Sequence, residues 1–269
     1  MDINRYLQEK KERVESALRE YFPREEELTR NLSKAMKHSL FAGGKRVRPI
    51  LAIASFDAAG GTGDRILPFA CALEMIHTYS LIHDDLPAID NDDYRRGKPT
   101  CHKAFGEAIA ILAGDGLLTE AFHLMTHRPG KDHSASDDAV AIDLIREVAQ
   151  AAGVLGMVGG QVVDIESEGK APDEKTLHFI HTRKTGALIT VSLRAGALLG
   201  GANDDALDAL TEYGRHAGLA FQIADDILNV EGDAKALGKG TGSDQSRGKL
   251  TYPALVGVET SRRVAAELV

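Results

Sequence analysis

The sequence has little cysteine: Cys71 and Cys101 are the only two in 269 residues. Two cysteines are too few for a disulfide framework, and their separation matches no Cys-x-x-Cys metal motif. We therefore expect free thiols and a reducing compartment. Long apolar runs are also missing, because the stretch from Ala187 to Ala202 contains Arg194, and the N-terminal segment MDINRYLQEKKERVES is charged throughout. These absences predict a soluble, cytoplasmic protein with no membrane partner.

Basic residues are scarce relative to acidic ones, since 32 Lys and Arg against 40 Asp and Glu give a formal net charge of −8. A general binder of nucleic acid or of anionic membranes is normally basic, so this balance disfavours both classes. Low-complexity tracts and internal repeats are absent too, which argues against a disordered chain or a solenoid. The hydrophobic share of 43% is that of an ordinary globular protein. We expect one domain over residues 1–269.

Strand-like alternation is not evident, and apolar residues recur at the helical period almost throughout. The clearest run extends from Leu67 to Ile82, and similar patterns cover about 103–127, 139–167, 174–200, 204–230 and 252–269. The sequence predicts an all-α fold of about ten helices, with a long surface loop at 130–138. Glycines at 153, 156, 159 and 160 lie about one turn apart and predict close helix approach.

An acidic segment, DDLPAIDNDD, places five aspartates between Asp84 and Asp93 and interrupts an apolar helix at Leu86-Pro87. Like charges this close destabilise a fold unless they are solvated or face something positive. One interpretation is a solvated helix end. The other is a cation site, which is favoured by His77 on the same helix face and by the bases that follow, Arg95, Arg96 and Lys98.

A second acidic pair, Asp225-Asp226, lies within the apolar segment AGLAFQIADDILNV. On a helix, Gln222, Asp225, Asp226 and Asn229 form one polar stripe on an otherwise core-forming segment. Burying an unpaired carboxylate costs several kcal/mol, so the pair predicts metal ions or fixed cations opposite it.

Oxygen ligands without clustered His or Cys favour Mg²⁺, Ca²⁺ or Mn²⁺ over zinc. A calcium EF-hand beginning at Asp90 fails, because Tyr94, Arg95 and Cys101 occupy the fifth, sixth and twelfth positions. Magnesium that bridges to phosphate oxygens fits better. Short basic groups at turns supply donors for phosphate, although GTGSDQSRGK is not a Walker A loop. They are GGKRVRP from Gly43, Arg95-Arg96, Lys184-Thr185-Gly186, Lys239 and Lys249.

These motifs together, in order and at these separations, closely resemble the trans-prenyltransferases, the head-to-tail isoprenyl diphosphate synthases. The segments that carry the resemblance are GGKRVRP, MIHTYSLIHDDLPAIDNDDYRRGKPT, KTG and FQIADDIL, within about residues 28–258. The resemblance implies a single isoprenoid synthase domain with a deep central cavity, two aspartate-rich motifs facing each other across it, a magnesium cluster and a homodimer.

The resemblance also implies a role for each matching residue. Asp84, Asp90 and Asp225 resemble the magnesium ligands of the allylic diphosphate, with Asp85 and Asp226 close by. The residues that resemble the family's other contacts to the allylic substrate are Arg95, Lys184, Thr185, Gln222, Lys239 and Lys249. The residues that resemble the family's isopentenyl diphosphate pocket are Gly44, Lys45, Arg48, His77 and Arg96.

In this chemistry an allylic C–O bond ionises, and the released diphosphate must be met by fixed cations, here Mg²⁺ and basic side chains. The double bond of isopentenyl diphosphate then attacks the allylic cation, and a diphosphate oxygen removes the proton, so no protein base is required. Tyr79-Ser80 before the first motif resembles the bacterial-type farnesyl diphosphate synthases. A bulky ring at Tyr79 should end the growing chain at C15, with geranyl or geranylgeranyl diphosphate as alternative products.

Two features depart from the family pattern: Asn229 replaces the usual Asp, and the chain stops at Val269, short of the final helix or helices that members carry. Two other functions are weaker alternatives. A non-catalytic synthase subunit would lose the motifs that this chain keeps. An HD-type phosphohydrolase would fit His83-Asp84 but needs further His ligands and leaves Asp225-Asp226 unexplained.

Overall fold

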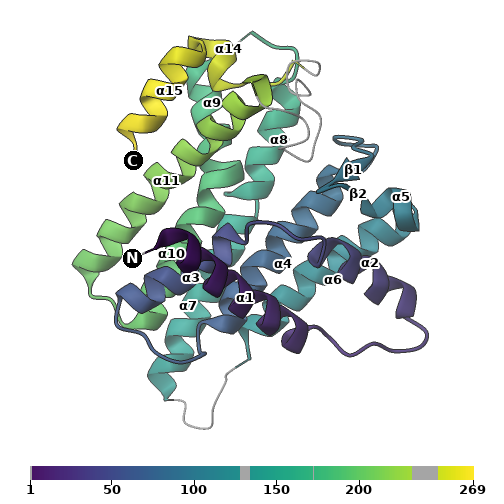
Figure 1. The fold of residues 1–269 in the computed structure, drawn as a ribbon, viewed down its shortest axis with the longest axis vertical. Coiled ribbons are helices and arrows are strands. Elements are labelled where there is room, and N and C mark those ends of the chain that lie inside the picture. Colours follow the sequence, from purple (N-terminus) through teal and green to yellow (C-terminus); the bar gives the residue numbers. More distant parts are fainter. Residues whose placement is uncertain (1, 128–133, 172, 232–247) are drawn as a thin grey trace. The chain divides into compact units, whose positions relative to one another are not determined.

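The computed structural model describes residues 2–127, 134–171, 173–231 and 248–269, and helices dominate these ranges (Figure 1). The predicted all-α class is confirmed. The first helices are α1 Ile3–Tyr21, α2 Arg30–Leu40, α3 Val47–Ala58, α4 Leu67–Asp84, α5 Cys101–Phe105, α6 Glu107–Met125 and α7 Ala135–Ala152. The later ones are α8 Met157–Ser167, α9 Glu174–Ile180, the π-helix η1 His181–Gly186, α10 Ala187–Gly200, α11 Asp204–Glu231, α14 Tyr252–Val256 and α15 Val258–Glu267. One short strand pair, β1 Tyr94–Arg95 and β2 Lys98–Pro99, lies between α4 and α5.

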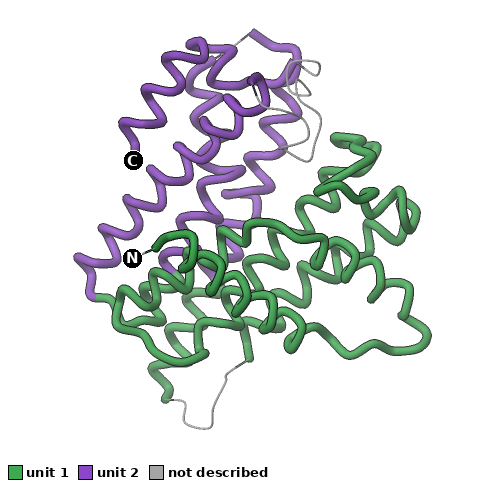
Figure 2. The backbone as a smooth tube through the Cα atoms, viewed as in Figure 1, with its two compact units in different colours: residues 1–145, 195–202 green, residues 146–194, 203–269 purple. Residues whose placement is uncertain are grey.

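The chain divides into two compact units, coloured separately in Figure 2. Unit 1 comprises residues 1–145 and 195–202, and unit 2 comprises 146–194 and 203–269. The first acidic segment and the GGKRVRP turn belong to unit 1, whereas η1 and the second acidic pair belong to unit 2. The expected single domain remains a prediction.

The core of unit 1 is built on the packing of α4 against α6. α4 is apolar on nearly every face and is buried from Leu67 to Ile76, which is typical of a helix inside a core. Gly114 on α6 permits the close approach, because a Cβ there would lie 2.1 Å from Nε2 of His83 on α4. This packing fixes the C-terminal end of α4, where the acidic segment begins.

Unit 2 is organised around α11, which packs along η1 and α15. Glycines allow the helix backbones to approach closely. A Cβ at Gly218 would lie 2.8 Å from the Gly186 Cα, and one at Gly160 would lie 2.3 Å from the backbone nitrogen of Lys184. The predicted close approach is therefore confirmed at Gly160. The expected helix over 139–167 is instead broken at 153–156 into α7 and α8, because the glycines there weaken the helix.

η1 replaces a regular helical turn at HTRKTG with π-type hydrogen bonding, between α9 and α10. Single π-turns inside helices occur frequently at functional sites. The sequence analysis placed this segment within one continuous helix over 174–200. Six residues of altered backbone bonding leave no trace in the apolar period, so the pattern could not reveal the π-helix.

Two helical stretches, Glu107–Met125 and Ala135–Ser167, are long and apolar enough to cross a membrane by length and composition alone. This is weak evidence, because the core helices of soluble proteins pass the same test, and α6 is packed against α4. Of the surface loop expected at 130–138, residues 135–138 are helical instead, since α7 begins at Ala135, and residues 130–133 lie outside the described ranges.

Candidate active site

The first acidic segment begins where α4 ends. Pro87 cannot continue the helix, and the chain folds back so that the Asp90 amide donates to the Asp84 carbonyl oxygen at 2.8 Å. Asn91 completes the turn with a φ of 50°, a left-handed conformation that asparagine adopts readily. Asp84 and Asp90 are therefore neighbours in space, and both are partly exposed.

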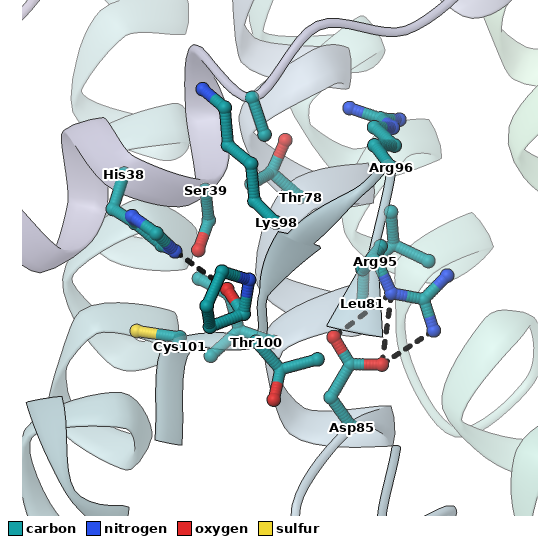
Figure 3. A pocket seen from close by; sticks show the side chains of 13 residues that line it. His38, Ser39, Thr78, Leu81, Asp85, Arg95, Arg96, Lys98, Thr100 and Cys101 are labelled. Carbon is teal, nitrogen blue, oxygen red and sulfur yellow. Dashed lines mark hydrogen bonds and ion pairs between the residues drawn. The ribbon is translucent and has the colours of Figure 1, made fainter. Parts of the chain in front are cut away.

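Asp85 lies differently, because its side chain is only 4% exposed. Its carboxylate oxygens Oδ1 and Oδ2 accept hydrogen bonds from Arg95 Nε at 2.8 and 2.9 Å. Burial raises the pKa of Asp85, and the Arg95 guanidinium opposes that shift. Figure 3 shows Arg95 turned toward Asp85 while Arg96 extends away from the pair. The carboxylate therefore fixes the position of Arg95 in this structure.

The hairpin that carries Arg95 and Arg96 was not predicted. Tyr94 pairs with Pro99 and Arg95 with Lys98 in an antiparallel register. The turn residues Arg96 and Gly97 have φ values of 53° and 74°, and positive φ at both central positions is the requirement of a type I′ hairpin. Strands of two residues are too short to show alternation, so periodicity could not reveal them.

Arg48, His77 and Arg96 form what we call the cationic cluster of unit 1. Arg48 is 9% exposed, and its buried Nε has no hydrogen-bond partner. Burial lowers the pKa of Arg48, Glu74 opposes that shift, and the nearby Arg96 charge lowers the pKa further. Burial likewise lowers the pKa of His77 well below its usual value, with Arg48 and Arg96 adding to the effect. A buried guanidinium that is short of one partner and feels a second positive charge favours an anion beside it.

Gly44 fits closely against the cationic cluster. Arg96 donates from Nη1 to the Gly43 carbonyl oxygen, and its guanidinium lies so near Gly44 that a Cβ there would be 2.7 Å from Arg96 Cζ. Gly43 and Gly44 have φ values of 98° and 127°, which favour glycine. Lys45, the next residue, is exposed.

Arg46 in the same turn has a structural task that the sequence analysis did not assign. Its guanidinium is fully buried and donates to Glu74 at 2.6 Å, to Glu15 at 2.7 Å and to the Leu40 carbonyl oxygen at 2.7 Å. Its φ of 53° is unusual for a residue with a side chain. A glutamate at position 74, inside an otherwise apolar helix, was the signal that could have identified this ion pair.

In unit 2, the predicted polar stripe of α11 forms a chain of hydrogen bonds with η1. Thr185 Oγ1 donates to Gln222 Oε1 at 2.6 Å, and Gln222 Nε2 donates to Asp226 Oδ1 at 2.9 Å. Asp226 and Asn229 are buried, at 3% and 2% exposed, whereas Asp225 is partly exposed. The two adjacent carboxylates therefore differ in exposure, because Asp226 is buried against Gln222 whereas Asp225 is partly exposed.

Lys184 on η1 and Lys249 converge on Asp164 of α8. The distances from their Nζ atoms to Asp164 Oδ2 are 2.6 and 3.8 Å, and Asp164 is 5% exposed. Sequence reasoning missed Asp164, although a carboxylate in the apolar segment VVDI was an available signal. Lys239 lies outside the described residues.

Tyr79 and Ser80 lie on α4 before the acidic segment. Tyr79 is 7% exposed, and its ring meets His83 edge-on at 5.7 Å between centroids. Ser80 Oγ donates to the His77 carbonyl oxygen at 3.0 Å. Burial raises the pKa of Tyr79 to about 12, so the phenol is neutral at physiological pH. The role of Tyr79 in limiting chain length remains a prediction.

Comparison with known proteins identifies relatives over nearly the whole chain. A family model described as polyprenyl synthetase matches residues 29–269. The farnesyl diphosphate synthase of Geobacillus stearothermophilus is 51% identical over 266 residues, covering 99% of this chain and 88% of the relative. The geranylgeranyl diphosphate synthase of Cyanophora paradoxa is 48% identical over 265 residues, covering 98% and 86%.

Among solved structures, a Helicobacter pylori geranyltransferase complexed with magnesium and isoprenyl diphosphate has a TM-score of 0.87 and 34% identity. The similarity covers 98% of this chain and 86% of that one. A family model that spans most of the sequence, and relatives at about half identity, agree with the motifs in both units. The chain therefore belongs to the polyprenyl synthetase family.

Proposed function

We propose that this protein is a farnesyl diphosphate synthase, which condenses isopentenyl diphosphate with dimethylallyl and then geranyl diphosphate. The observation that carries the proposal is the cationic cluster, where Arg48 has a buried nitrogen without a partner beside a second arginine. A diphosphate supplies the negative charge and the acceptor oxygens that this arrangement favours. The farnesyl diphosphate synthase relatives at about half identity support the substrate class.

We assign isopentenyl diphosphate to unit 1. Arg48 and Arg96 would bind its phosphates, His77 would donate a hydrogen bond, and the exposed Lys45 would add a further charge. Gly44 leaves space for the Arg96 guanidinium. In this proposal these residues bind and orient isopentenyl diphosphate, the nucleophile, and none of them removes a proton.

Magnesium suits the carboxylates at the end of α4. Asp84 and Asp90 offer oxygen ligands, which magnesium prefers, and the Asp90–Asp84 backbone hydrogen bond brings them together. Within the described ranges, no three His, Cys, Asp or Glu side chains lie close enough to hold an ion by themselves. Magnesium characteristically completes its coordination with water and substrate phosphate, so two carboxylates are compatible with it. Asp225, the more exposed carboxylate of the second pair, is assigned to magnesium from the resemblance.

When bound, magnesium would neutralise charge on the diphosphate that leaves the allylic substrate. From the resemblance, Arg95, Lys184, Lys239 and Lys249 are all assigned to this diphosphate as fixed cations. Thr185 and Gln222, joined by a 2.6 Å hydrogen bond, would orient the substrate at η1. Asp85 and Asp226 are engaged by Arg95 and Gln222 respectively, and so position their neighbours.

We also propose a cytoplasmic homodimer. Cys71 and Cys101 are free and buried, as suits a reducing compartment. Ile111 and Leu112 on α6 are 44% and 52% exposed, and adjacent apolar side chains on a core helix are suited to a subunit interface. Light scattering of the purified protein would give a dimer mass if the proposal is right.

The decisive experiment incubates the protein with isopentenyl diphosphate, Mg²⁺ and each of the C5, C10 and C15 allylic diphosphates, and identifies the products. We expect farnesyl diphosphate from the C5 and C10 starters. No elongation from any starter would contradict the enzyme assignment, and a C20 product would favour the geranylgeranyl alternative, which the 48% identical Cyanophora enzyme keeps open. Arg48→Ala should lose activity, with Arg24→Ala as the control.

A further inference from the structure

The buried carboxylate of Asp226 is a meeting point for three segments of unit 2. Its Oδ1 accepts from Gln222 Nε2 on α11, and its Oδ2 accepts from the Tyr252 backbone amide, at 3.0 Å, where α14 begins. His181 Nε2, from the first residue of η1, lies 3.3 Å from the same Oδ2. The side chains of His181 and Asp226 are 3% and 4% exposed, so water does not replace these contacts.

The ring of His181 does more than fill space. It stacks on Tyr252 with centroids 5.4 Å apart and an angle of 28° between the planes. Its Nδ1 is buried and has no hydrogen-bond partner, which is unfavourable. A phenylalanine would make the same stack without that cost, so the atom that distinguishes histidine here is Nε2, which faces Asp226.

The position of His181 excludes it from reacting directly with substrate. One ring nitrogen faces a protein carboxylate, the other is enclosed, and the side chain is almost wholly buried. What His181 touches, however, connects to the residues assigned to substrate. Lys184 and Thr185 follow it on η1, Asp225 adjoins Asp226 on α11, and Lys249 precedes Tyr252.

We propose that His181 is a positioning residue, which ties η1 and the start of α14 to Asp226 and so sets the relative placement of Asp225, Lys184 and Lys249. The inference rests on the proposed function, because it gives those three residues a common ligand, magnesium diphosphate. A second link, through Asp164 to Lys184 and Lys249, joins the two ammonium groups. His181 adds a side-chain contact to Asp226 itself, beside the Thr185–Gln222 and Tyr252–Asp226 hydrogen bonds.

Two near-isosteric amides separate the nitrogen atoms of His181. The glutamine amide reaches the position of Nε2 and can donate to Asp226, whereas the asparagine amide reaches only the position of Nδ1. His181→Phe keeps the ring stack and removes both nitrogens. We therefore compare His181→Gln, His181→Asn and His181→Phe with the unmodified protein.

The measurements are the KM for geranyl diphosphate, the KM for isopentenyl diphosphate, the Mg²⁺ concentration for half-maximal activity and the thermal midpoint. Calorimetry adds a measurement of binding that does not depend on turnover. Its ligand is Mg²⁺ with a geranyl diphosphate analogue whose bond to the diphosphate cannot be cleaved. Losing a residue that orients a metal ligand typically weakens metal binding about 10- to 100-fold. We expect that loss for the Asn and Phe variants in the Mg²⁺ requirement and in analogue binding, with the KM for isopentenyl diphosphate unchanged and the Gln variant near the unmodified protein.

Three results would overturn the proposal. Equal behaviour of the Gln and Asn variants would show that Nε2 does not matter. A loss of kcat with every KM and analogue affinity unchanged would indicate only a smaller folded fraction. Failure of the Asn variant to fold, beside a normal Gln variant, would assign His181 to folding. If the unmodified protein itself elongates no starter, the proposed function fails instead, and the two failures are thereby distinguished.

Discussion

A single methyl group at Gly44 tests the cationic cluster mechanically. A Cβ at this position would lie 2.7 Å from Arg96 Cζ and 2.8 Å from its two terminal nitrogens, so the guanidinium must move. The loss of one hydrogen bond to a charged group costs about 1.5–3 kcal/mol, which corresponds to a roughly 10- to 150-fold weaker affinity. We expect Gly44→Ala to raise the KM for isopentenyl diphosphate by about this factor, with little change in the KM for geranyl diphosphate.

Gly43 is a matched control for this substitution. Its φ of 98° also disfavours a side chain, so alanine at either position strains the backbone by about 1–3 kcal/mol. A Cβ at Gly43, however, meets nothing within 4 Å. Steady-state kinetics at saturating geranyl diphosphate and Mg²⁺, with thermal unfolding in parallel, separates the two effects. An unchanged KM in Gly44→Ala, or an equal rise in Gly43→Ala, would refute the reasoning about Arg96.

Three further predictions concern other residues of unit 1. Tyr79→Ala removes the bulk assigned to chain termination and should give products longer than C15 by chromatography; C15 alone would remove that assignment. Glu74→Gln breaks a buried ion pair with Arg46, which should cost about 3–5 kcal/mol and lower the Tm by roughly 6–10 °C in calorimetry; a Tm within experimental error of the unmodified protein would contradict the estimate. His77 has a lowered pKa when folded, so protons bind the unfolded chain first as the pH falls below about 6.5, and stability present above that pH is lost. Urea unfolding of His77→Asn should therefore show a shallower loss between pH 6.5 and 5 than the unmodified protein, and parallel curves would argue against it.

Sequence patterns identified the parts of this molecule whose signal is local. α4 was visible because its apolar residues cover nearly every face, and the acidic segment after it was visible because Pro87 ends the helix among five carboxylates. The stripe on α11 followed from spacing alone, and the hydrogen bond from Gln222 to Asp226 agrees with it. A feature contained in one or two helical turns can be read without knowing what lies opposite.

The features that were missed depend on distant partners or on backbone conformation. The GGKRVRP turn has three similar basic residues, Lys45, Arg46 and Arg48. Arg46 has a left-handed φ, and its buried guanidinium forms ion pairs with Glu15 and Glu74. Spacing does not reveal which base finds a carboxylate on another helix.

Asp164 and His181 were missed for the same reason. Their partners are Lys184 and Asp226, which lie on other helical elements. The π-helix that brings these groups together alters hydrogen bonding without altering the apolar pattern.

The pairing of Arg95 with Asp85 has a consequence for turnover. Two nitrogens of Arg95, Nε and Nη2, already donate to this carboxylate, so an anion that recruits the arginine gains only the difference between its own hydrogen bonds and those it displaces. In the proposed function, the same competition would weaken the binding of inorganic diphosphate after the carbon–oxygen bond has broken. In the proposed function, Asp85 would recapture Arg95 as the charged product departs and would restore the arrangement described here.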